Sequence, residues 1–111
     1  MEKIAQYRDT IKQILQEYGN RKFRYQDLQS QVVADDQNGH YYLLRLGWDG
    51  DERIHNMVFH FDIINGKIWI QQNWTDVDIA QRLETMGISK SDIVLGFQPV
   101  DVRPLTGYAV A

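Results

Sequence analysis

Residues 60–74 read HFDIINGKIWIQQNW, and this stretch decides the fold. Asn65-Gly66 at its centre is typical of a two-residue turn between antiparallel strands, because both residues accept positive φ angles. Such a turn fixes which residues of the two strands face one another. The predicted pairs are Ile64 with Lys67, Ile63 with Ile68, Asp62 with Trp69, Phe61 with Ile70 and His60 with Gln71.

Side chains of a strand alternate between its two faces, so the hairpin and the strand before it divide into two sets. The first set is apolar and is predicted to be the core: Met57, Phe59, Phe61, Ile63, Ile68, Ile70 and Trp74, with Tyr42, Leu44, Leu46 and Trp48. The second set mixes aromatic, aliphatic and charged residues: Val58, His60, Asp62, Ile64, Lys67, Trp69, Gln71 and Asn73, with Tyr41, Leu43 and Arg45.

Mixed aromatic and charged surfaces are typical of protein interfaces, so we predict that the second face docks a partner. The residues predicted to form this docking face are Tyr41, Arg45, His60, Asp62, Trp69 and Gln71. Self-association and binding of a second protein are both open. The alternative is that the C-terminal tail or a helix of the same chain covers this face.

The rest of the chain supplies the other elements of a single α+β domain over residues 1–111. Apolar residues at helical spacing predict a first helix: Ile4, Tyr7, Ile11, Ile14, Leu15 and Tyr18. Strands are predicted over 29–35, 40–48, 53–64 and 67–73, and short connections favour a four-stranded antiparallel meander. A second helix is predicted to begin at Thr75, capped by Thr75 with Asp78, and to end at Gly87. An irregular C-terminal tail follows.

Composition narrows the classes of protein that fit. The chain has 111 residues, 43% of them hydrophobic, and no cysteine, which excludes disulfides and thiol catalysis. The first ten residues carry charges and do not resemble a secretory signal, and no run approaches the roughly 20 apolar residues that cross a bilayer. We expect a cytoplasmic protein that contacts no membrane.

The charge pattern argues against strong binding of nucleic acid. The net charge is -3, whereas affinity for DNA depends on neutralising phosphates with lysine and arginine. One basic stretch, RKFRY at residues 21–25, could touch phosphate and stack a base, which leaves a weak DNA-binding module as an alternative. We expect contact with DNA to be indirect.

Few residues form a pattern that predicts catalysis. His60 and Asp62 are two residues apart on one strand, so the pair could orient a general base in a small hydrolase or nuclease. A structural hydrogen bond is the simpler interpretation. His40, His55 and His60 could in principle bind a metal, but an odd spacing sends His55 and His60 to opposite faces of a regular strand. We therefore predict no catalytic residue, no cofactor and no metal.

Three segments carry a family resemblance: HYYLLRLGWDGDERIH (40–55), FHFDIINGKIWIQ (59–71) and GISKSDIVLGFQPVDVRPLTGYAVA (87–111). They resemble the XisI family of cyanobacterial fdxN element excision controlling factors. The most specific parts are Gly47-Trp48, residues 66–71 and residues 92–97, and the resemblance covers nearly the whole chain. Two departures stand out: the family usually has Asp-x-Thr-Glu where this chain has residues 73–76, and often has histidine where it has Gln98.

The resemblance implies a non-enzymatic accessory protein. It would control the programmed excision of a DNA element by a site-specific recombinase, through contacts with an XisH-like partner that resembles a nuclease. No catalytic residue of the family can be carried over to this sequence, in agreement with the absence of a convergent catalytic set.

Overall fold

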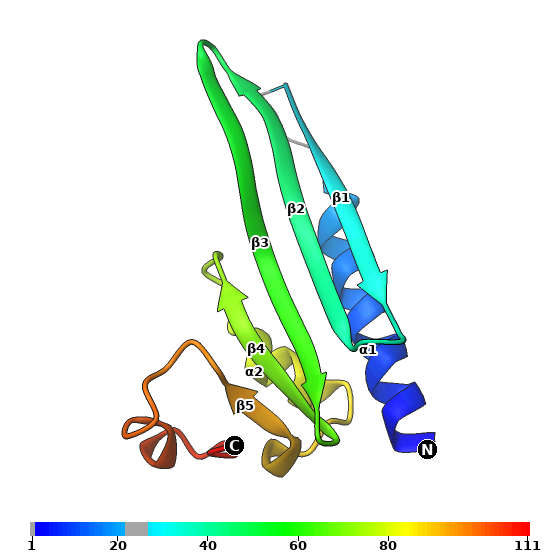
Figure 1. Ribbon diagram of the computed structural model, residues 1–111, viewed down its shortest axis with the longest axis vertical. Coiled ribbons are helices and arrows are strands. Elements are labelled where there is room, and N and C mark those ends of the chain that lie inside the picture. The colour runs from blue at the N-terminus through cyan, green and yellow to red at the C-terminus, as the bar shows by residue number, and fades with distance from the viewer. Residues whose placement is uncertain (1, 22–26) are drawn as a thin grey trace.

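The computed structural model describes residues 2–21 and 27–111. The elements follow in the order α1 (Glu2–Gly19), β1 (Asp27–Asp35), β2 (His40–Asp49), β3 (Glu52–Ile64), β4 (Lys67–Asn73), α2 (Ile79–Thr85), η1 (Lys90–Asp92), β5 (Ile93–Leu95) and η2 (Arg103–Leu105). Figure 1 shows one sheet with both α-helices on the same side of it. None of the helices in the described ranges has the length and apolar character needed to cross a membrane.

The five strands form a mixed sheet in the order β1-β2-β3-β4-β5. The first four are antiparallel neighbours, as predicted. The prediction of four strands was wrong, because β5 joins the sheet parallel to β4. A parallel neighbour needs a crossover connection, and α2 with η1 supplies it. At three residues, β5 is too short to show an alternation in the sequence.

The central hairpin has the turn that its sequence predicts. Asn65 and Gly66 have φ angles of 52° and 78°, as a two-residue turn of this kind requires. Four of the five predicted pairs are confirmed, from Ile64–Lys67 to Phe61–Ile70. The fifth is wrong: a shift in register between His60 and Phe61 places His60 opposite Gln72 and leaves Gln71 as the extra residue of a bulge.

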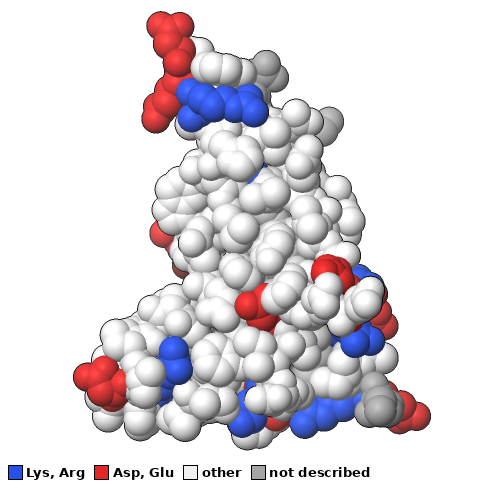
Figure 2. Space-filling model, in the orientation of Figure 1, with Lys and Arg blue, Asp and Glu red and all other residues white. Residues whose placement is uncertain are grey.

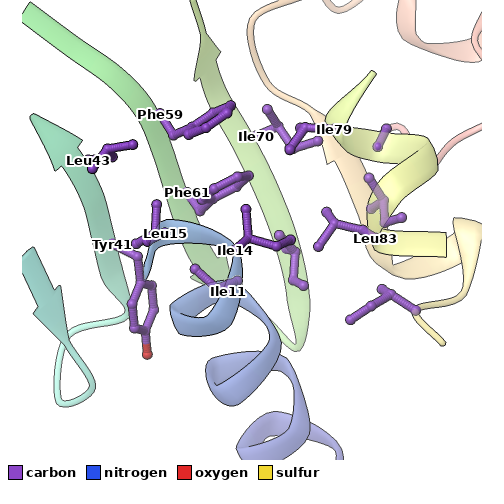
Figure 3. Close-up of a cluster of buried hydrophobic side chains, with 14 of the residues drawn as sticks. Ile11, Ile14, Leu15, Tyr41, Leu43, Phe59, Phe61, Ile70, Ile79 and Leu83 are labelled. Atoms are coloured by element: carbon purple, nitrogen blue, oxygen red, sulfur yellow. The ribbon is translucent and has the colours of Figure 1, made fainter. Parts of the chain in front are cut away.

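The core lies between the sheet and the two helices. Figure 3 shows Tyr41, Leu43, Phe59, Phe61 and Ile70 of the sheet meeting Ile11, Ile14 and Leu15 of α1 and Ile79 and Leu83 of α2. All ten side chains are at most 1% exposed. The apolar stripe predicted for the first helix is thereby confirmed from Tyr7 to Tyr18, whereas Ile4 is only partly buried.

A bulge in β3 reverses the predicted faces of β2. Leu44 pairs with Met57, as a two-residue turn at 50–51 requires, but Leu43 pairs with Phe59, so Val58 is an extra residue. One extra residue moves every later side chain of the partner strand to the other face. Tyr41 and Leu43 therefore share the buried face with Phe59, and the predicted core position of Tyr42 was wrong.

The same bulge explains other errors in the predicted core. Leu44, Leu46 and Met57 are only partly buried, and Trp48 is 50% exposed on the part of the β2–β3 hairpin that extends beyond the helices. A different bulge, at Gln71 in β4, lies between Ile70 and Trp74, and Trp74 is 60% exposed. Neither of these two tryptophans belongs to the core.

The second helix begins later than predicted. Asp78 is its N-cap and accepts a hydrogen bond from Gln81 N at 3.1 Å. Thr75 instead accepts a hydrogen bond from Val77 N and donates one to Asn73 Oδ1, so it shapes the loop before the helix. The helix ends before Gly87, which has a φ of 97°. The tail after β5 is irregular except for η2 and one bridge between Ala109 and Val94.

Candidate functional site

The side of the sheet away from α1 and α2 carries the candidate site, and we call it the open face. Register and alternation place on it Val33, His40, Tyr42, His60, Asp62, Ile64, Trp69 and Gln71. Figure 2, in the orientation of Figure 1, shows few lysine, arginine, aspartate or glutamate side chains across the middle of this face. Most of the charges lie at the tip of the long hairpin and around the lower rim.

Asp62 is the centre of a polar cluster on this face. It pairs with His40 across β2 and β3, and His60 lies two residues before it on the same strand. Asp62 Oδ1 lies 2.8 Å from His40 Nδ1 and 3.0 Å from His60 Nε2, and Asp62 Oδ2 accepts a hydrogen bond from Gln71 Nε2 at 3.2 Å. A carboxylate that is 7% exposed is thus satisfied by three donors.

These contacts set the ionisation state of Asp62. Burial alone would raise the pKa of its carboxyl, but the hydrogen bonds from His40, His60 and Gln71, with the charge of His60, hold that pKa below its usual value. Asp62 is therefore an acceptor for both imidazoles at neutral pH. Each histidine directs one ring nitrogen to the carboxylate, and the other ring nitrogen remains available.

Tyr42 lies beside both histidines. Its ring is edge-on to His60 with centroids 4.6 Å apart, and it stacks on His40 at 6.3 Å. Aromatic contacts of these geometries restrict the orientations of all three rings. The cluster is therefore built on two adjacent strands and held by packing as well as by hydrogen bonds.

The structure separates the residues of the predicted docking face into two groups. His60, Asp62, Trp69 and Gln71 lie together on the open face, as predicted. Tyr41 and Arg45 lie on the opposite, helix-covered face, so their predicted position was wrong because of the bulge at Val58.

Each of the two misplaced residues has surroundings of its own. Tyr41 is fully buried, and its hydroxyl donates to Asp36 Oδ1 at 2.8 Å, which together with burial raises the pKa of Tyr41 to about 12. Arg45 lines a hollow of about 430 Å³ together with Tyr18 and Trp74. Burial lowers the pKa of the Arg45 guanidinium.

Sequence reasoning named His40 only in a possible metal-binding trio with His55 and His60, and it placed Tyr42 in the core. His40 directly follows the turn that ends at Gly39, which has a φ of 74°. If β2 and β3 paired regularly from Asp49–Glu52 onward, Tyr41 would lie opposite His60. The bulge places Tyr42 there instead. The two adjacent residues Val58 and Phe59 are both apolar, so the sequence contains no signal that distinguishes the bulge from a regular strand.

The tail covers the open face in part. The guanidinium of Arg103 lies 5.1 Å from the ring centroid of Trp69. Arg103 in turn donates to the carbonyl oxygens of Gln98 at 3.1 Å and Val110 at 3.3 Å. Gly96 also approaches this tryptophan closely, since a Cβ placed there would lie 3.0 Å from it. Trp69 is therefore half-buried by its own chain, whereas the region around Tyr42 and Val33 remains open.

The other candidate residues from the sequence lie elsewhere. His55 is exposed and pairs with Leu46 on the projecting hairpin. The bulge places it on the side of His60 despite the odd spacing, so the predicted separation of faces was wrong, but it lies outside the Asp62 cluster. Of the basic stretch 21–25, only Arg21 is within the described residues, and it packs 4.1 Å from the ring of Tyr18.

The fold and the site define a class of small α+β domains with one sheet, two helices on one side and a polar cluster on the other. The chain belongs to the XisI family, because the family model described as XisI protein matches residues 1–110 of the sequence. The family resemblance of the sequence is thereby confirmed.

Two solved structures share this fold. A XisI-like protein from Anabaena variabilis ATCC 29413 is 41% identical with a TM-score of 0.91, over 97% of this chain and 99% of the other. The fdxN element excision controlling factor XisI from the same organism is 33% identical with a TM-score of 0.84, over 98% of this chain and 99% of the other. No match was found among curated proteins.

Proposed function

We propose that this chain is a controlling factor in the programmed excision of a DNA element and acts through protein contacts in the cytoplasm rather than by catalysis. The partner we propose is a nuclease-like protein of the XisH type, and DNA is contacted only indirectly through it. Membership of the XisI family supports the proposed role in DNA excision, since a relative with 33% identity is described as an excision controlling factor.

The observation that carries the contact-based mechanism is the open face. Both α-helices pack on the other side of the sheet (Figure 1). The register places Tyr42, Trp69 and aliphatic side chains on the open face, and Figure 2 shows few charged side chains across its middle. Val33 is 40% exposed and Ile64 is 39% exposed on this side. A contiguous surface of this composition on a small domain is typical of a protein interface.

Charge supports the same proposal. A chain with a net charge of -3 lacks the excess of lysine and arginine that phosphate binding requires. The open face itself has few cations in its middle. A partner that supplies the basic surface would bring this chain to DNA without direct contact.

The test is co-purification with an XisH-like protein. We expect the wild-type chain to bind, and Val33→Asp to weaken binding at least tenfold, because a carboxylate would be buried in the interface beside Tyr42. Val100→Asp is the matched control, since Val100 is 70% exposed in the tail and away from the sheet, and should bind as wild type. Circular dichroism checks that each variant is folded.

Two outcomes would contradict the proposal. The first is a folded Val33→Asp variant that binds the partner as well as wild type does, which would exclude the open face as the binding surface. The second is the absence of a complex with wild-type protein at every ionic strength tested, which would exclude an XisH-like protein as the partner. Ultracentrifugation of the chain alone, with the same two variants, determines whether the face mediates self-association instead.

A further inference from the structure

The cluster around Asp62 has the donor atoms of a metal site. His40, His60 and Asp62 each offer one metal-ligating atom, and these three atoms all lie within 4.8 Å of one another. Imidazole nitrogen and carboxylate oxygen are the ligands that zinc and other divalent transition metals take in proteins. Two histidines with one carboxylate on one face form a set with positions left for further ligands.

Two distances within the cluster suit ligands that share one ion. Asp62 Oδ1 lies 2.8 Å from His40 Nδ1 and 3.0 Å from His60 Nε2. An ion about 2.1 Å from each of these atoms would hold the oxygen and either nitrogen at about 90° to one another. An angle of about 90° is that between adjacent ligands in octahedral coordination. Tetrahedral coordination would require the oxygen and the nitrogens to move slightly further apart.

The surroundings hold the three ligands in place. Gln71 donates to Asp62 Oδ2, which leaves Oδ1 directed to the histidines. Tyr42 contacts both imidazole rings, and all of these residues except Gln71 lie in regular pairs of β2 and β3. Groups that orient the ligands in this way are a regular part of metal sites, and strands are a rigid support for them.

The site is accessible and its protons can be relocated. The side chains of His40 and His60 are 45% and 27% exposed, so an ion and a water ligand can reach them. In each histidine, the ring nitrogen that now contacts Asp62 is the one that would coordinate the ion. A neutral imidazole can carry its proton on the other ring nitrogen, so both rings can coordinate in their neutral form.

We propose that His40, His60 and Asp62 bind a divalent transition-metal ion such as Zn²⁺ through Nδ1, Nε2 and Oδ1. This site goes beyond the proposed function and does not depend on it, because it concerns the isolated chain. Its position on the open face, near the end of the sheet where β1 turns into β2, gives the ion free coordination positions on the side where a partner would dock.

The test is titration of untagged, chelator-treated protein with Zn²⁺ in a calorimeter. We expect one saturable site for the wild type. His60→Ala and His40→Ala should each weaken binding at least tenfold, since each removes one of three ligands. His55→Ala is the matched control, because His55 is exposed and outside the cluster, and it should bind as wild type. Gln71→Leu should weaken binding less than either His40→Ala or His60→Ala does, by releasing the carboxylate.

A second measurement separates coordination from folding. Co²⁺ replaces Zn²⁺ in such sites, and its visible absorption reports the number and type of its ligands. We expect an absorption band on addition of one equivalent of Co²⁺, lost in His60→Ala and retained in His55→Ala, with circular dichroism unchanged in both. The proposal is overturned by the absence of saturable binding to the wild type, or by folded His40→Ala and His60→Ala variants that bind as tightly as wild type.

Discussion

The hydroxyl of Tyr7 in α1 donates a hydrogen bond to the carboxylate of Asp92, the residue immediately before β5. Lys3 Nζ lies 2.7 Å from the same carboxylate. Asp92 is mostly buried, with 13% of its side chain exposed. The contacts join the first helix to the strand added at the edge of the sheet, and so connect the two ends of the chain.

This carboxylate makes stability depend on pH. Burial alone would raise the pKa of Asp92, but hydrogen bonds from Lys3 and Tyr7 hold it below its usual value. A depressed pKa in the folded state adds stability that is present above the unfolded pKa of about 3.9 and is lost as pH falls through the folded pKa. We expect Asp92→Asn to lower the free energy of unfolding at pH 7 by about 1–2 kcal/mol, and this difference to shrink below about pH 4.

Urea denaturation at pH 7 and at pH 3 measures both effects. Asp101→Asn is the control, because Asp101 is an exposed acid of the tail, and it should change stability little at either pH. Equal stability of Asp92→Asn and wild type at pH 7 would show that the link between α1 and β5 contributes nothing.

Two isoleucines test the position of the core. Ile11 of α1 is fully buried against the sheet, whereas Ile64 is 39% exposed on the open face. We expect Ile11→Ala to cost about 2–5 kcal/mol of unfolding free energy and Ile64→Ala less than about 1 kcal/mol. Urea denaturation gives both values. Similar costs for the two variants would contradict the assignment of the helix-covered face as the core.

Most of the fold was predicted from two features of the sequence, the residues typical of turns and the spacing of the apolar residues. Asn65-Gly66 gave the register of β3 and β4 up to Phe61, and the spacing from Tyr7 to Tyr18 gave the buried face of α1. Both signals are local, because a turn residue or a helical stripe acts within a few residues of itself. The short strand β5 has no such signal and is held by pairing with β4 after a crossover.

The faces of β2 could not be predicted because its two alternating sets are both apolar. Tyr41 and Leu43 alternate with Tyr42 and Leu44, so composition does not determine which set is buried. The register counted from the turn at 50–51 would have decided it, but the bulge at Val58 moves the pairing by one residue. Tyr42 was missed as a neighbour of His60 for this reason.

Two glycines with positive φ differ in the space around them. Gly39 has a φ of 74°, and a Cβ built on it would lie 2.8 Å from the carbonyl oxygen of Ile63. Gly66 has a φ of 78° and has no such neighbour within 4 Å. We expect Gly66→Ala to cost about 1 kcal/mol through backbone strain alone and Gly39→Ala to cost clearly more.

Thermal unfolding of the two variants gives the comparison directly. The additional cost of Gly39→Ala comes from the clash with the backbone of β3, which anchors the end of the sheet next to His40. A smaller loss of stability for Gly39→Ala than for Gly66→Ala would show that this turn is not packed against β3 in solution.

The isolated chain should bind duplex DNA weakly. Its net charge is -3, and the basic stretch at 21–25 is short. We expect no dissociation constant below about 10⁻⁶ M at physiological salt, which is the range of non-specific contacts. A gel-shift titration measures this dissociation constant for two duplexes, one with the sequence at the end of an excised DNA element and one with that sequence scrambled. Nanomolar binding that discriminates between the two duplexes would favour direct recognition over recruitment by a partner.

The last prediction concerns the His60–Asp62 pair as catalytic machinery. The two side chains are in contact at 3.0 Å, as a base and its orienting acid would be. Within the described residues, however, no serine or threonine hydroxyl is hydrogen-bonded to either of them, and Asp62 is shared with His40 and Gln71. The described residues therefore give the pair no side-chain nucleophile to activate. We expect purified protein to leave supercoiled DNA intact with Mg²⁺, Mn²⁺ or Zn²⁺. Cleavage that is abolished by His60→Ala and retained by His55→Ala, with both variants folded, would replace the accessory role by an enzymatic one.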